Sequence, residues 1–288
     1  MRISRLFILL FIATSLLYSC DQVDVINRYV EVSTNQPDSS DSMPDSAIVF
    51  ERTVLLEEFT GQKCTNCPDA HRMVAQLLNQ YGDRLISVAI HSGGFGIAES
   101  SSSAKMLGLM QPEGDVYANF WGVQAYPSGV VDRRGGVLAA TDFAGSIYKE
   151  MQRETEMGIF LNAAIDNVDG KQVIKCHVEL ESTVDIDGKL QLWVTESNIK
   201  AFQVDNGKPV VDYEHNHVYR ACIKDTEDQG LWGEDVAIKE NIAMSFDRQI
   251  AVKDNWNPEN LSVVAFVYND KDGVYQAAEC KVVLPSAE

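Results

Sequence analysis

Residues 54–78, VLLEEFTGQKCTNCPDAHRMVAQLL, hold the pattern that decides the fold of the first half of the chain. The apolar run at its start predicts a buried strand at residues 53–59. Apolar residues then recur at helical spacing, and Pro68 is a residue type that suits the first turn of a helix. The motif Cys64-Thr65-Asn66-Cys67 is therefore expected at the start of a helix that follows a buried strand.

The position of these two cysteines predicts redox chemistry. Free N–H groups and the helix dipole stabilise a thiolate at a helix start, so Cys64 is the predicted nucleophile. Cys67, one turn further along, is placed to resolve a mixed disulfide on Cys64. A purely structural disulfide is one alternative. Half of a zinc site is another, but it needs a second cysteine pair, which the solitary Cys176, Cys222 and Cys280 do not supply.

The rest of the first half predicts an α/β arrangement. Residues 84–91 predict a second buried strand, which completes a strand, helix and parallel strand unit. The loop with Gly93, Gly94 and Gly96 lacks the context of a phosphate-binding loop and is expected to be flexible. Tyr126-Pro127 then enters a strand, and residues 142–156 predict a closing amphipathic helix.

This order of elements resembles the thioredoxin fold. The resemblance implies that Tyr126-Pro127 is a cis-proline element, which would shape a substrate groove beside the disulfide. It also places Glu58 on the family's buried carboxylate, the implied proton acceptor for the second cysteine; a surface glutamate on an edge strand is the alternative. The chain departs from thioredoxin at Lys63 and Thr65-Asn66, and no lysine follows Val88-Ala89. These departures leave the redox potential and its direction open.

Two phrases, residues 57–68 and His215-Asn216-His217-Val218-Tyr219-Arg220, resemble the Omp-twenty-eight-related outer membrane lipoproteins. The resemblance spans both halves of the chain. It implies an address in the cell envelope, with a thioredoxin-like domain at residues 48–157 and a β-domain at residues 158–288. It implies no particular substrate.

The first nineteen residues predict an export signal. Arg2 and Arg5 precede an apolar run at residues 6–17 that is too short to be a good membrane span. Leu17-Tyr18-Ser19-Cys20 resembles a lipobox, which implies cleavage after residue 19 and acyl chains such as palmitate on Cys20; an ordinary secreted cysteine is the alternative. Residues 20–47 are polar and predict a flexible tether to the outer membrane, with leaflet and orientation open.

The second half predicts an all-β domain. At residues 174–180, apolar and polar residues alternate, which indicates a strand with one buried face. About seven such strands, separated by Asp, Asn and Gly turns, predict an immunoglobulin-like sandwich. The other expected strands lie at about residues 158–166, 188–197, 215–223, 236–246, 261–269 and 273–284.

The second half also contains cysteines and histidines that are candidate sites. Cys176 and Cys280 occupy inward positions, as buried free thiols or as a disulfide pair, and Cys222 is ambiguous. His215 and His217 lie on one face of an expected strand. No carboxylate or cysteine at suitable spacing completes a metal site, so both are expected to be surface or turn histidines. The sequence predicts no metal and no cofactor.

The sequence thus predicts a membrane-tethered thiol–disulfide oxidoreductase that acts on exported proteins or on a redox partner. In this hypothesis Cys64 attacks, Cys67 resolves, Glu58 assists proton transfer and Tyr126-Pro127 shapes the groove. The alternative is a binding or adhesion lipoprotein in which Cys64–Cys67 is a fixed structural disulfide. A formal net charge of −18 argues against nucleic acid as a partner. The client, the direction of exchange and the oligomeric state stay open.

Overall fold

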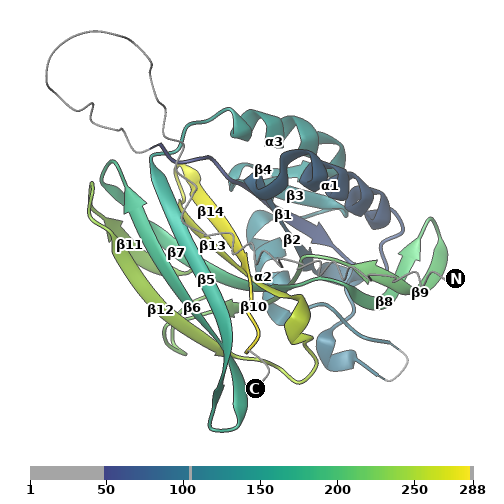
Figure 1. The fold of residues 1–288 in the computed structure, drawn as a ribbon. Coiled ribbons are helices and arrows are strands. Elements are labelled where there is room, and N and C mark those ends of the chain that lie inside the picture. Colours follow the sequence, from purple (N-terminus) through teal and green to yellow (C-terminus); the bar gives the residue numbers. More distant parts are fainter. Residues whose placement is uncertain (1–48, 104–105, 286–288) are drawn as a thin grey trace, which may run out of the picture.

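The computed structural model describes residues 49–103 and 106–285, and a nine-stranded mixed sheet forms its centre (Figure 1). Its strands are β1 (Val54–Thr60), β2 (Leu85–His91), β3 (Ser128–Val131), β4 (Arg134–Ala139), β7 (Ile186–Glu196), β10 (Val218–Ile223), β11 (Glu234–Ile238), β13 (Leu261–Asn269) and β14 (Gly273–Lys281). They are ordered β14-β13-β7-β10-β2-β1-β3-β4, with β11 paired to β7. The two halves meet where β10 pairs parallel to β2, through Val218 and Ala89.

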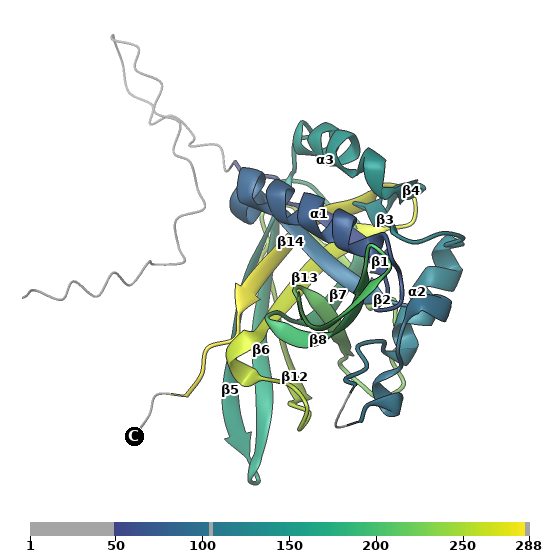
Figure 2. The same ribbon diagram turned by 90° about the vertical axis from the view of Figure 1, so that its right-hand side faces the viewer.

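Three helices cover the part of the sheet that belongs to the first half (Figure 2). They are α1 (Cys67–Tyr81), α2 (Pro112–Trp121) and α3 (Phe143–Met151). Side chains on a strand alternate between faces, so Val54 and Leu56 of β1 pack with α1 and α3. Leu55 and Phe59 of the same strand pack on the opposite face with α2. Because both faces are covered, every residue of β1 is buried, its polar residues included.

The predicted strand, helix and parallel strand unit is present. β1 and β2 are parallel, with Val54 opposite Leu85, and α1 connects them. β3 pairs antiparallel with the other edge of β1, so β1 is an interior strand. This position determines the surroundings of every polar side chain on β1.

A second, three-stranded sheet covers the second half of the large sheet. It consists of β5 (Met157–Val168), β6 (Lys171–Ser182) and β12 (Met244–Ala251). Ile174 of β6 packs in one apolar cluster with Leu192 of the large sheet, which explains the predicted alternation in β6. The large sheet nevertheless continues through both halves. This shared sheet is the main difference from the arrangement of successive domains that the sequence suggested.

The remaining pair of strands was not predicted. β8 (Ile199–Asp205) and β9 (Lys208–His215) form a separate hairpin that lies beside α1 (Figure 1). Its turn is Asn206-Gly207, and both residues have positive φ, 49° and 77°. An Asn-Gly turn between strand-forming residues is a strong hairpin signal that the sequence analysis missed.

Two predicted strands had incorrect limits for related reasons. Residues 236–246 contain the end of β11 and the start of β12, which pair with different sheets. Residues 215–223 are also not one strand, because β9 ends at His215 and β10 begins at Val218. Between them His217 adopts a φ of 55°, which turns the chain from the hairpin into the large sheet.

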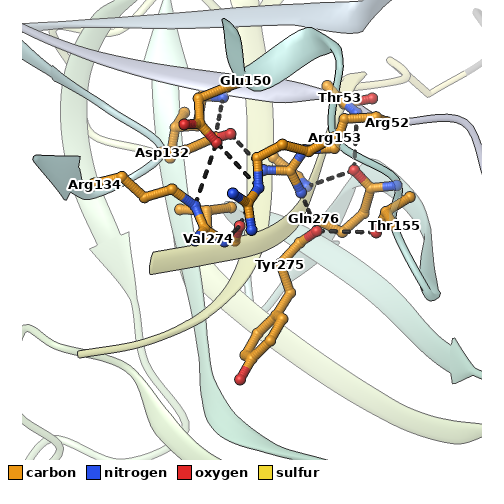
Figure 3. A network of polar contacts seen from close by, with 12 residues as sticks. Arg52, Thr53, Asp132, Arg134, Glu150, Arg153, Thr155, Val274, Tyr275 and Gln276 are labelled. Carbon is orange, nitrogen blue, oxygen red and sulfur yellow. Dashed lines mark hydrogen bonds and ion pairs between the residues drawn. The ribbon is translucent and has the colours of Figure 1, made fainter. Parts of the chain in front are cut away.

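A buried polar network ties the beginning of the folded chain to its end (Figure 3). Arg52 pairs with the Asp132 carboxylate and donates to the carbonyl oxygens of Tyr275 and Val274 in β14. The Thr53 N–H donates to Gln276 Oε1 at 3.0 Å. The side chains of Arg52 and Asp132 are 4% and 0% exposed, so each charge offsets the cost of removing the other from water.

No helix in the described residues is both long and apolar enough to cross a membrane. The predicted export signal, the lipidation site Cys20 and the tether at residues 20–47 lie outside the described residues.

Candidate functional site

Cys64 and Cys67 form a disulfide at the N-terminus of α1. Their Cα atoms are 5.5 Å apart, and α1 begins at Cys67 with Pro68 in its first turn. The placement of the motif at a helix start is therefore confirmed. Both residues are nevertheless buried, with 2% of Cys64 and 0% of Cys67 exposed.

The unpredicted β8–β9 hairpin covers the motif. Gln203 Nε2 donates to the carbonyl oxygen of Cys64 at 2.9 Å. At the hairpin turn, the N–H groups of Asn206 and Gly207 donate to the carbonyl and the hydroxyl oxygen of Thr65, at 3.1 and 2.6 Å. These bonds occupy polar groups around the disulfide, and the hairpin would have to move before another chain could bind them.

Glu58 lies in the interior of the sheet rather than on its edge. It is 2% exposed, and it lies opposite Ala89 of β2 on one side and Gly129 of β3 on the other. The alternative of a surface glutamate on an edge strand is therefore wrong. Burial away from water raises the pKa of Glu58 to about 8. At neutral pH the carboxyl group is mostly protonated and can act as a proton donor or, once ionised, as an acceptor.

A cavity of about 220 Å³ lies between Glu58, α1, β2 and the end of the hairpin. Four histidines line it: the buried His91 from β2 and His215 at the end of β9, and the partly buried His71 from α1 and His217 from the turn after β9. The ring centroids of His91 and His215 are 5.3 Å apart, and those of His71 and His215 are 6.4 Å apart. The prediction that His215 is a surface or turn residue is wrong, because β9 ends inside this cluster and His215 is 2% exposed.

Burial keeps these imidazoles neutral. Desolvation lowers the pKa of His71 to about 4 and that of His215 to about 3, and it holds the pKa of His91 well below its usual value. Neighbouring imidazoles lower the pKa values of His91 and His215 further. Within the described residues, no group of three or more His, Cys, Asp or Glu side chains is arranged to hold a metal ion.

Tyr126-Pro127 is a cis peptide, as the thioredoxin resemblance implied. The Tyr126 hydroxyl is hydrogen-bonded to Ser92 Oγ at 3.0 Å, and its ring lies 5.5 Å from that of Phe95. The Phe95 carbonyl in turn accepts from the N–H of Lys63, next to the disulfide. This glycine-containing loop, expected to be flexible, is thus held between the Tyr126-Pro127 element and the motif.

The other described cysteines are free thiols. Cys176 and Cys222 are buried, and Cys280 is partly buried. Cys176 and Cys280 lie in neighbouring parts of one apolar cluster without being bonded, so the suggested disulfide between them is absent. Burial raises the pKa of Cys176 to about 11 and the pKa values of Cys222 and Cys280 to about 12. These thiols are poor nucleophiles at neutral pH.

The fold and the site together define a mostly β, mixed-sheet protein with a covered disulfide at a helix N-terminus. The family described as outer membrane protein Omp28 matches residues 114–283, which is more than half of the chain. The chain therefore belongs to the Omp28 family, and its place is the cell envelope at the outer membrane. The matched segment includes the hairpin but begins after the disulfide motif.

The solved structures that match this chain include two from Porphyromonas gingivalis. HBP35 of Porphyromonas gingivalis has 17% sequence identity and a TM-score of 0.65, over 83% of this chain and 78% of that chain. A domain of the outer membrane lipoprotein Omp28 from Porphyromonas gingivalis has 23% identity and a TM-score of 0.31, over 46% of this chain and 92% of that chain. At this identity, HBP35 supports the similarity of fold alone. None of the curated proteins matches the chain.

Proposed function

We propose that this protein is a lipid-anchored thiol–disulfide exchange protein of the envelope, in which the β8–β9 hairpin gates the Cys64–Cys67 disulfide. The observation that carries the proposal is the combination of a disulfide at the N-terminus of α1 with the buried carboxyl group of Glu58 beneath that helix. Cys20 would carry the lipid, and residues 20–47 would be the tether. The clients would be thiols or disulfides of exported proteins.

The thioredoxin-like part of the proposal rests on local architecture. The parallel pair β1 and β2, joined by α1 and followed by the cis Tyr126-Pro127 element, supports a thioredoxin-like unit in the first half. The packing of β5, β6 and β12 against the large sheet supports a sandwich in the second half. We infer that the second half supplies the gate, because β8 and β9 belong to it.

The exchange proceeds in two balanced steps after the Asn206-Gly207 turn of the hairpin has moved away from Thr65. A client thiolate attacks Cys64 Sγ, the Cys64–Cys67 bond breaks, and the Cys67 thiolate takes the proton of the Glu58 carboxyl group. A second client thiolate then attacks the client sulfur of the mixed disulfide and releases the Cys64 thiolate. The client loses two electrons and the protein gains them; the reverse sequence reduces a client disulfide.

The test is the reduction potential of the Cys64–Cys67 pair. The soluble chain from Asp21 onward is equilibrated with glutathione buffers, and the alkylated peptides are identified by mass spectrometry. A potential between about −120 and −270 mV is expected for an exchange protein. A pair that stays oxidised below about −300 mV would overturn the proposal. Cys67→Ser, which cannot close the disulfide, is the control for the assignment of peptides.

A binding lipoprotein with a structural disulfide is the second candidate. The burial of both cysteines beneath the hairpin favours it, since a reactive cysteine is normally accessible. In that case the disulfide would hold the hairpin and α1 in place. The two candidates differ in the native accessibility of Cys64 as well as in the potential.

A further inference from the structure

We propose that His71 and Tyr213 form the proton path between the buried Glu58 carboxyl group and solvent. In this path His71 accepts the proton from Glu58, and Tyr213 passes a proton on to water. This inference rests on the proposed exchange function, and it names residues that neither the sequence motif nor the thioredoxin resemblance indicated. His71 comes from α1 and Tyr213 from β9, so the path crosses from the redox motif to the hairpin.

The atoms form a series with one gap, between Glu58 and His71. Glu58 Oε1 lies 3.8 Å from His71 Nε2, and His71 Nδ1 is hydrogen-bonded to the Tyr213 hydroxyl at 3.0 Å. The Thr60 hydroxyl also lies 2.8 Å from His71 Nε2 and holds the ring in this orientation. A movement of about 1 Å would bring the Glu58 oxygen within hydrogen-bond distance of the imidazole.

His71 is also suitably placed with respect to the disulfide. Cys67 and His71 are four residues apart on α1, so their side chains occupy the same face of the helix. Glu58 lines the cavity beneath that face. His71 is therefore the residue next to Glu58 that a proton would reach after it has moved from Cys67 to Glu58.

The two fully buried imidazoles of the cavity, those of His91 and His215, do not provide an equivalent exit. Within the described residues, both ring nitrogens of His91 and the Nε2 atom of His215 lack a hydrogen-bond partner. Both residues are 2% exposed. His71, by contrast, has a partner on each nitrogen and is 17% exposed, and Tyr213 is only partly buried.

Burial, with a smaller effect from neighbouring charges, keeps the His71 imidazole neutral. Burial lowers the pKa of His71 first, Arg72 lowers it further, and Asp205 raises it in part. A neutral imidazole can accept a proton on one nitrogen while it gives up the proton on the other. The titratable groups that face the path from α1, β2, β8 and the β9 end are Arg72, His91, Asp205, Tyr213, Glu214, His215 and His217.

The transfer is balanced in both directions. When Cys67 attacks a mixed disulfide on Cys64, its thiol proton passes to the Glu58 carboxylate. Glu58 gives a proton to His71 Nε2, and the proton on Nδ1 leaves through the Tyr213 hydroxyl to water. No electrons move along this path; it only returns Glu58 to the ionised state that the next attack requires.

The experiment separates the two sulfur steps. Reduced protein is mixed with dithiobis-nitrobenzoate: attack by Cys64 releases one coloured thiolate, and attack by Cys67 on the mixed disulfide releases a second one. Tyr213→Phe and His71→Gln are compared with wild type across a range of pH. Tyr148→Phe is the matched control, because Tyr148 is 60% exposed on α3. Thermal unfolding verifies that each variant is folded.

We expect the second release to slow by about tenfold or more near neutral pH in Tyr213→Phe and His71→Gln, with the first release unchanged. The difference should vanish well above the ordinary thiol pKa of about 8.5, where hydroxide removes the proton directly. Two normal releases with the same pH profile as wild type would refute the proton path and leave the exchange function intact. Absence of both releases in reducible wild-type protein would refute the exchange function and the path with it.

Discussion

Glu58 is a carboxyl group whose burial makes the stability of the protein depend on pH. Its pKa rises from 4.5 in the unfolded chain to about 8 in the folded protein because burial penalises the charged form. The folded state therefore holds this proton more tightly than the unfolded state. The resulting stabilisation is fully present below pH 4.5 and is lost as the pH rises through about 8.

Glu58→Gln is expected to remove this dependence, because the amide resembles the protonated carboxyl group and cannot ionise. Between about pH 5 and about pH 9, wild type should lose at least about 1 kcal/mol of unfolding free energy relative to the variant. Urea unfolding at both pH values measures it. The exposed Glu227→Gln is the control. Parallel pH profiles for wild type and Glu58→Gln would show that Glu58 ionises normally.

At the scale of elements, the β8–β9 hairpin is the part that the exchange proposal depends on. Its turn requires a positive φ of 77° at Gly207. A side chain added there would meet no other atoms, but the backbone conformation would be strained. The β5–β6 turn contains Gly170 with the same φ of 77° and equally open surroundings. These two glycines form a matched pair, one beside the disulfide motif and one outside it.

Gly207→Val should loosen the hairpin and expose the disulfide, whereas Gly170→Val should not. A cost of about 1–2 kcal/mol for a side chain in the left-handed region corresponds to a roughly fivefold or larger rise in the rate of reduction by dithiothreitol. Trapping with an alkylating agent measures the rate. Equal rates in both variants would mean that the hairpin does not control access to Cys64.

At the scale of the whole molecule, the two halves are joined by one sheet and by a buried polar network. β10 inserts between β2 and β7, and Arg52 reaches from the start of β1 to Asp132 and to β14. Burial raises the pKa of Asp132 to about 6 although Arg52 opposes the shift. Removal of the guanidinium would leave this carboxyl group buried without its partner.

Arg52→Ala should destabilise the entire chain by about 3–5 kcal/mol, the usual cost of leaving one partner of a buried ion pair alone. Tryptophan fluorescence during urea unfolding should still show one cooperative transition, because the sheet crosses both halves. Arg153→Ala, at a 49% exposed side chain in the same network, should cost less than about 1 kcal/mol. Two separate transitions in wild type would contradict this coupling of the halves.

Much of the site was predictable because its signals are local. The helical spacing after Cys67, the apolar run of β1 and the Tyr126-Pro127 dipeptide each lie within a short stretch of chain. They predicted the strand, the helix and the position of the disulfide at the start of α1, and the resemblance to thioredoxin implied the cis peptide. The Asn206-Gly207 turn was equally local, and the hairpin could have been predicted from it.

By itself, then, the sequence determined the local elements, the disulfide motif and the family. Only the tertiary structure decided that β10 pairs with β2, that Gln203 and Gly207 bond to Cys64 and Thr65 over a buried disulfide, and that His71, His91 and His215 share one cavity with Glu58. The physical reason is distance along the chain. Periodicity reports which face of an element is buried, but it cannot tell which remote element buries it. Burial by remote elements is also what displaces the pKa values of Glu58 and the histidines.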